Sequence, residues 1–200
     1  MKTAKKALLL ALCAVLLVVA TVMGTLAYLK STTQVVTNTM TAGKVVITSL
    51  DESKVDLYGA PIEGAARVTE NEYKLIPGHK YVKDPVLVIE GGSEDAFVYV
   101  EVINEIADIE AAGDNTIANQ MATFGWTALP GVDNVYYKNY TAQETELHYS
   151  IFECFVVADG ADVAANIGDT IQVKGYAIQK DGFGADAVAA WNAAAFDRIA

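Results

Sequence analysis

The side chains best spaced for chemistry are Glu144, Glu146 and His148, which alternate with uncharged residues in the stretch ETELH. Side chains two positions apart on a β-strand lie on the same face, so these three could hold a metal ion at the surface. The same alternation is typical of a solvated strand edge, because charged side chains discourage pairing with a second sheet. We favour the solvated edge and expect no metal and no other cofactor.

Few other residues are suited to catalysis. The chain contains two histidines, and His79 follows Pro77-Gly78, where we expect an exposed turn without a functional role. The sequence has no histidine pair at helical spacing, no glycine-rich phosphate loop and no Gly-x-Ser-x-Gly motif. We therefore expect that the protein is not an enzyme, and keep a surface hydrolase only as a third hypothesis.

Cysteine chemistry is also limited. Cys154 lies between Phe152-Glu153 and Phe155-Val156-Val157, and a cysteine in such an apolar run usually packs as a small hydrophobe. The second cysteine, Cys13, belongs to the N-terminal apolar segment, so a disulfide within the remaining chain is excluded. We expect Cys154 to be buried, and an intermolecular disulfide is the alternative.

The N-terminus has the pattern of a secretory signal peptide. Three lysines precede the apolar run 7–24, and Thr25 and Ala27 place small residues at positions −3 and −1 of the bond to Tyr28. We expect cleavage between Ala27 and Tyr28, and hence a secreted protein found in the extracellular matrix or at the cell surface. Because the apolar run approaches the roughly 20 residues of a membrane span, permanent anchoring is the alternative.

The rest of the chain is strongly acidic. The net charge is −11, and all 25 acidic residues follow position 50. An acidic surface repels nucleic acid and anionic lipid, and it keeps a secreted protein soluble. We expect no nucleic-acid partner, and membrane contact only through an uncleaved signal segment.

After residue 28 the sequence predicts an all-β fold. Short runs rich in Val, Ile, Thr and Tyr alternate with Gly, Pro, Asn and Asp, which is typical of a two-sheet antiparallel sandwich. In the clearest strand Val98, Val100 and Val102 share one face, and Glu101 indicates that the opposite face is wetter. The expected strands cover residues 44–49, 86–90, 97–103, 135–140, 151–157 and 171–177.

Two segments favour helices. Residues 105–123 predict a short surface helix interrupted by Gly113. Near the C-terminus, apolar residues at helical intervals predict one stripe that packs on the sandwich as a closing helix. The residues of this stripe are Val188, Trp191, Ala195 and Ile199.

Several blocks resemble one family of exported bacterial proteins. Gly24-Thr25-Leu26-Ala27-Tyr28, followed by the segment 38–43 with Met40, resembles the start of the TasA and camelysin family, whose signal peptides are removed by a signal peptidase of the SipW type. The blocks YKLIPGHKYVKDPVLV, GSEDAFVYVEV and IQVKGYAIQKDGF are similar to later family segments and come in the same order. The resemblance implies a jelly-roll-like sandwich and a structural role in biofilm-matrix fibres. Protease activity, which is associated with camelysin-like members, has no zinc-protease motif here to carry it.

The segment 28–41 is a candidate donor strand. It is rich in β-branched residues and contains neither Pro nor Gly, so once cleavage frees it, it could add to a sheet edge on a neighbouring subunit. A head-to-tail contact of this kind produces a filament. Pairing with its own sheet, or fraying, is the alternative. Docking would use Val35 with Thr33, or Val36 with Gln34, and Met40 belongs to the same segment.

These expectations divide the chain into a signal peptide (1–27), a donor-type strand (28–41) and a β-sandwich domain (42–200). The favoured function is fibre formation, with the protein itself and the signal peptidase as partners. The alternative is a secreted monomeric binding module for carbohydrate or another cell-surface ligand. Such a module would use exposed aromatic side chains, since these offer flat apolar faces with polar tips. The candidates are Trp126, Tyr136, Tyr137 and Tyr140.

Overall fold

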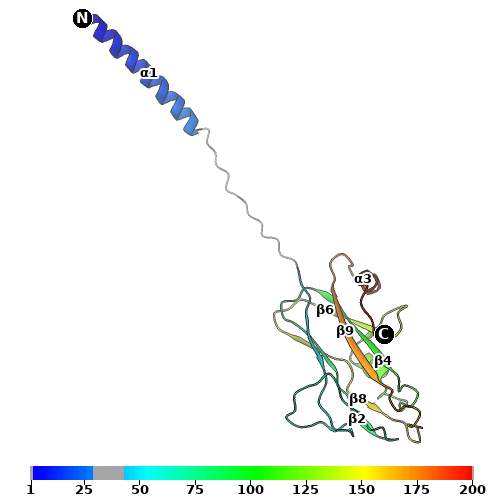
Figure 1. Ribbon diagram of the computed structural model, residues 1–200. Coiled ribbons are helices and arrows are strands. Elements are labelled where there is room, and N and C mark those ends of the chain that lie inside the picture. The colour runs from blue at the N-terminus through cyan, green and yellow to red at the C-terminus, as the bar shows by residue number, and fades with distance from the viewer. Residues whose placement is uncertain (1, 29–42, 200) are drawn as a thin grey trace. The chain divides into compact units, whose positions relative to one another are not determined.

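The computed structural model describes residues 2–28 and 43–199, which belong to two separate units (Figure 1). In the first unit, the helix α1 runs over Lys2–Tyr28 and exposes apolar side chains such as Leu8 and Leu16. Among the described residues, no helix has the length and apolar character needed to cross a membrane. The second unit contains every described strand.

The second unit consists mostly of antiparallel strands with a few helices, as expected. The described strands form a three-stranded sheet in the order β1-β3-β7, a four-stranded sheet in the order β5-β6-β4-β9, and the pair β2-β8. The strands are β1 (Ile47–Asp51), β2 (Lys80–Val82), β3 (Val86–Ile89), β4 (Ala96–Asn104), β5 (Thr127–Ala128), β6 (Val135–Tyr140), β7 (Leu147–Ser150), β8 (Cys154–Val156) and β9 (Ile171–Gln179). The helices are α2 (Ile117–Thr123) and α3 (Ala187–Ala194).

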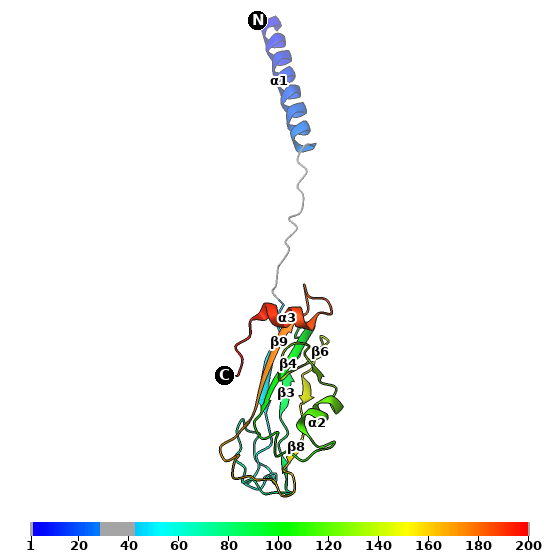
Figure 2. The same cartoon turned by 90° about the vertical axis from the view of Figure 1, so that its right-hand side faces the viewer.

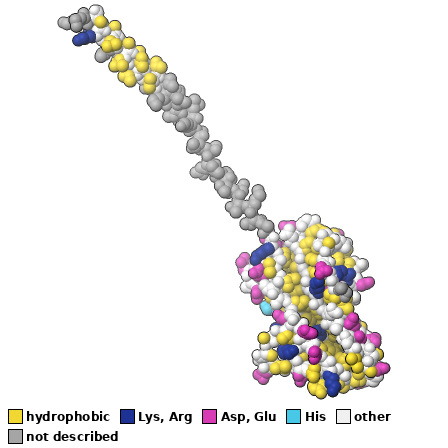
Figure 3. Space-filling view, viewed as in Figure 1, with side chains coloured by type: hydrophobic (Ala, Val, Ile, Leu, Met, Phe, Trp, Pro, Cys, Tyr) yellow, Lys and Arg dark blue, Asp and Glu magenta, His cyan; other side chains and the backbone are white. Residues whose placement is uncertain are grey.

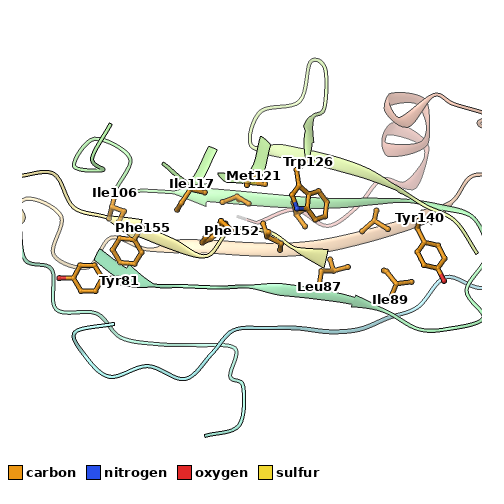
Figure 4. Close-up of a cluster of buried hydrophobic side chains, with 14 of the residues drawn as sticks. Tyr81, Leu87, Ile89, Ile106, Ile117, Met121, Trp126, Tyr140, Phe152 and Phe155 are labelled. Carbon is orange, nitrogen blue, oxygen red and sulfur yellow. The ribbon is translucent and has the colours of Figure 1, made fainter. Parts of the chain in front are cut away.

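The main apolar core lies between the two larger sheets (Figure 4). Leu87 and Ile89 of β3 and Val98 and Val100 of β4 belong to it, and all four are fully buried. The two sheets contact each other at Gly175 of β9, where an added Cβ would overlap the side chain of Leu87. A residue without a side chain therefore allows β9 to lie against β3.

The helix α3 forms a further layer beside β9 and β4 (Figure 2). Trp191 contacts Tyr99 and Tyr176 on the outer face of the four-stranded sheet, with ring centroids 5.0 and 5.3 Å apart. The expected packing of a C-terminal helix on the sandwich is therefore confirmed. The helix is shorter than its predicted stripe, because Ala195 adopts a left-handed conformation (φ 47°) and Ile199 lies beyond it.

One expectation about β4, that the face of Glu101 would be wetter, is wrong. The alternation in this strand predicted that Glu101 would lie on a wetter face, but Glu101 is 1% exposed. Tyr99 on the same face is also fully buried, because α3 and the residues after it cover this side of the sheet. β4 is consequently buried on both faces along most of its length.

The expected helix over residues 105–123 forms only at its C-terminal end. α2 begins after Thr116, whose hydroxyl accepts a hydrogen bond from the amide of Asn119 over 3.3 Å and caps the helix. Gly113 has a φ of 122°, a conformation that ends any earlier helix. Ile106 and Ile109 are still buried, in turns rather than in a helix.

The predicted strand boundaries agree best with the observed ones in the strands with the longest apolar alternation. β6 matches the predicted residues 135–140, and β4 and β9 extend their predictions by one or two residues. The strand expected at 44–49 starts only at Ile47, and the one expected at 151–157 is reduced to Cys154–Val156. Ile151 is instead bonded through its amide to the carbonyl of Pro85, outside the regular ladder.

Candidate functional site

The predicted cleavage and assembly residues lie in and after α1. Ala27 and Tyr28 are the last two residues of α1. The assembly residues lie outside the described part of the chain, so the structure places none of them. They are Thr33, Gln34, Val35, Val36 and Met40.

The other half of a donor-strand contact would be an open sheet edge, and β9 provides one. β9 forms the edge of the four-stranded sheet and pairs along all nine residues with β4. Within residues 43–199, no strand pairs with its other side. Its side chains are mostly half-buried, so this edge borders the core on one face and α3 on the other.

The two faces of β9 differ in character. Val173 and Gly175 face the main core, whereas Tyr176 belongs to the outer layer with α3. Lys174 is the only charged residue in the strand, and its ammonium donates a hydrogen bond to the carbonyl of Asp197 over 2.6 Å. Lysines on edge strands commonly discourage unwanted pairing, and this one is held by the C-terminal residues.

The stretch that contains Glu144, Glu146 and His148 lies at the edge of the sandwich opposite β9. His148 belongs to β7, the edge strand of the three-stranded sheet, and its side chain is 63% exposed. Its Nε2 atom lies 3.9 Å from Oε2 of Glu146, which is also exposed. No metal-binding group of three such residues occurs in the described segments. All three side chains are exposed, as the favoured solvated edge predicts, but Glu144 and Glu146 precede β7 and only His148 lies in the strand.

The aromatic side chains proposed for ligand binding are mostly inside the protein. Trp126 is 4% exposed, and its indole nitrogen donates to the carbonyl of Ser150 over 2.9 Å. Tyr140 is fully buried, whereas Tyr136 and Tyr137 are half-buried. Between the two positions open to these residues, core or exposed surface, the structure places Trp126 and Tyr140 in the main core.

Cys154 is buried, which confirms the favoured interpretation. Its sulfur lies 3.6 Å from Oε1 of Gln120, and that oxygen also accepts a hydrogen bond from the Cys154 amide over 3.2 Å. His79 differs from the expected exposed turn. It is half-buried, with Nε2 2.8 Å from the carbonyl oxygen of Tyr58 and its ring against Tyr81.

The sequence did not indicate a buried polar cluster formed by Glu52, Asn71 and Lys83. Lys83 forms an ion pair with Glu52 over 2.7 Å, and the Asn71 amide donates to the same carboxylate over 2.9 Å. The side chains of Lys83 and Glu52 are 11% and 5% exposed. The three positions are far apart in sequence and fit no local motif, so only the fold could bring them together.

The described surface also has two shallow hollows. One, of about 540 Å³, is lined by residues 54–57 and 70–72 and therefore opens beside Asn71. The other, of about 480 Å³, lies between α3 and β6, where Tyr137 and Phe183 contribute aromatic surface.

Comparison of the chain with known proteins gave no match to any family model, to any curated protein or to any solved structure.

Proposed function

We propose that the protein is a secreted structural protein that assembles into extracellular biofilm-matrix fibres, as the resemblance to the TasA and camelysin family implies. In this proposal, residues 1–27 act as a signal peptide that a peptidase of the SipW type removes between Ala27 and Tyr28. The freed segment 28–41 then pairs with β9 of the next subunit. The observation that carries the proposal is the long edge of β9, which lacks a second partner in the described part of the chain.

The length and surroundings of β9 suit an added strand. Nine residues span about 30 Å, which a segment of the length of 28–41 can follow throughout. Main-chain hydrogen bonds along this edge would provide affinity, and alternate side chains would set the register. An added strand would also cover the half-buried Val173, which belongs to the rim of the main core.

We propose further that the sandwich is of the jelly-roll type. The connections from β3 to β4 and from β6 to β7 each pass from one large sheet to the other, as jelly-roll connections do. The first and last strands also lie together, since Ile47 of β1 is close to Gly175 of β9. These two strands form edges of different sheets on the same side of the sandwich.

Electron microscopy tests fibre formation directly. A chain beginning at Tyr28 would be compared with one beginning at Ala42, the first residue of the second compact unit, at equal concentration and mildly acidic pH. We expect filaments from the first chain and single particles from the second. Filaments from both would contradict strand donation, and particles from both would favour the monomeric binding module.

Two point variants in the longer chain identify the docking register. Val35 and Val36 point to opposite sides of a strand, so only one of them can face the acceptor. Val35→Asp and Val36→Asp therefore serve as controls for each other, because they add the same charge to the same segment. We expect one variant to abolish filaments and the other to retain them. Equal behaviour of the two would argue against a docked strand.

A further inference from the structure

The amine of Lys83 and the carboxamide of Asn71 each contact one oxygen of the buried Glu52 carboxylate. Nζ of Lys83 lies 2.7 Å from Oε2 of Glu52, and Nδ2 of Asn71 lies 2.9 Å from Oε1. Glu52 directly follows β1, Lys83 directly follows β2, and Asn71 belongs to the connection between these strands. The fold thus places a nucleophile and an acyl group around a shared proton carrier.

The remaining contacts of Asn71 orient its amide as an acyl donor. Its oxygen accepts a hydrogen bond from the backbone amide of Val55 over 3.1 Å. A fixed N–H group at this position would stabilise the negative charge that develops on the oxygen when a nucleophile attacks the carbon. Its nitrogen also donates to the carbonyl of Ser53 over 2.8 Å, so the orientation of the amide is fixed at both ends.

Aromatic rings lie beside the side chain of Lys83. Its ammonium lies 6.0 Å from the ring centre of Tyr73, and that ring packs edge-on against Tyr81 and Phe155. Burial raises the pKa of Tyr73, and the charge of Glu52 raises it further. Transfer of one proton from the Lys83 ammonium to Glu52 would convert this ion pair into two neutral groups. The neutral amine of Lys83 is the form that can attack a carbonyl carbon.

We propose that Lys83 and Asn71 join in an intramolecular amide bond, with Glu52 as the proton carrier. The bond from Nζ of Lys83 to Cγ of Asn71 forms, and the bond from Cγ to Nδ2 breaks. Glu52 removes two protons in turn from the Lys83 ammonium: one is passed to Nδ2, which leaves as ammonia, and the other is released to solvent. Nothing is oxidised or reduced, and no co-reactant is consumed. The hollow of about 540 Å³ beside Asn71 provides the ammonia with a path to solvent.

The mass of the full-length chain tests this bond. Loss of one ammonia lowers the mass by about 17 Da relative to the value required by the sequence and the observed N-terminus. Lys83→Arg retains the positive charge opposite Glu52 but cannot supply a neutral amine, so we expect the full mass for this variant. Lys44→Arg is the matched control, since Lys44 pairs with Glu90 at the surface, and it is expected to show the lower mass. The full mass for the unchanged chain would overturn the proposal.

Peptide mapping distinguishes this bond from a succinimide at Asn71, which also releases one ammonia. The amide bond makes trypsin leave Lys83 uncut and joins the peptide 68–74 to the peptide 81–138. A succinimide gives no joined peptide and persists in Lys83→Arg, and this result would also overturn the proposal. Glu52→Gln is expected to keep the full mass, because an amide side chain cannot carry the proton.

Discussion

Arg198 donates a hydrogen bond from Nε to Oε1 of Glu101 over 2.8 Å, although the two residues are 97 positions apart in the chain. The same carboxylate accepts hydrogen bonds from the hydroxyl of Tyr176 over 2.7 Å and from the amide of Ile199 over 3.0 Å. Tyr176 of β9 and two residues after α3, Arg198 and Ile199, therefore supply the partners that a buried carboxylate requires. The hydrogen bonds from Arg198 and Ile199 hold the C-terminal segment against the outer face of β4 and β9.

Removing this partner is expected to destabilise the fold. Arg198→Ala leaves Glu101 buried with fewer hydrogen bonds, so we expect the free energy of unfolding to fall by about 2–3 kcal/mol. Lys174→Ala is the control, because Lys174 is about as exposed as Arg198 but its carboxylate partner, Asp197, is fully exposed, and we expect a change within about 0.5 kcal/mol. Urea unfolding of both variants measures the difference. Equal effects would show that Glu101 does not depend on Arg198.

The contribution of Glu101 is expected to depend on pH. Burial alone would raise the pKa of Glu101, but the hydrogen bonds from Ile199, Tyr176 and Arg198, and the charge of Arg198, lower it below the ordinary 4.5. A lowered pKa in the folded state stabilises the protein above the unfolded pKa, and this stabilisation is lost as the pH falls through the folded value. The stability advantage over Glu101→Gln should therefore be complete near neutral pH and shrink below 4.5. An advantage that grows on acidification would contradict the assignment.

A side chain at Gly175 is expected to separate the two sheets. Gly175→Ala places a methyl group against the buried Leu87, and overpacking of this kind costs about 1–3 kcal/mol. Leu87→Ala creates room at the same point but leaves a cavity when it is introduced alone. The double variant should lose less stability than the sum of the two single variants, as thermal or urea unfolding would measure. Simple additivity would show that the two residues do not share this contact.

Cys154 is expected to resist thiol reagents in the folded protein. Its side chain is 3% exposed, so modification requires local or global opening. The labelling rate of the chain beginning at Tyr28 should therefore rise steeply with urea, in parallel with unfolding. Thr127→Cys is the control, because Thr127 is exposed on β5 and a cysteine there should label at once. Ser93→Cys is unsuitable, because Ser93 is also buried. Rapid labelling of Cys154 in the native protein would contradict its burial.

Mild acid is expected to promote filament formation. Acidic side chains are spread over the face of the second unit in Figure 3, and the sequence has an isoelectric point near 4.5. Lowering the pH towards this value reduces repulsion between subunits, and added salt should act in the same direction by screening. Light scattering at a series of pH values measures the rate. Assembly that speeds up as the pH rises from about 5 to about 8 would contradict this electrostatic account.

The sequence predicted the fold best where one alternating pattern determined a strand. The valines of β4 and the apolar alternation of β9 identified two adjacent strands of the larger sheet, and β6 was predicted at its observed bounds. β2 and β5 were not predicted, since strands of three and two residues carry almost no periodic signal. Glu101 was misplaced because the residues that cover it come from the distant C-terminus.

The candidate sites were predictable to different degrees. The exposure of Glu146 and His148 followed from local alternation, and the burial of Cys154 followed from its apolar neighbours. Trp126 and Tyr140 could not be assigned to the core or the surface, because either position is compatible with an aromatic residue in a strand-rich sequence. Glu52, Asn71 and Lys83 meet only after β1 and β2 have been positioned, so no spacing in the sequence indicated the cluster.

The two tryptophans of the chain lie in different layers: Trp126 in the core between the sheets, and Trp191 on the buried face of α3. Trp126→Phe leaves Trp191 as the single indole fluorophore, which then reports on the docking of α3. Trp191→Phe leaves Trp126, which reports on the packing between the sheets. Intrinsic fluorescence can therefore record, without any added dye, whether the outer layer detaches before the sandwich opens.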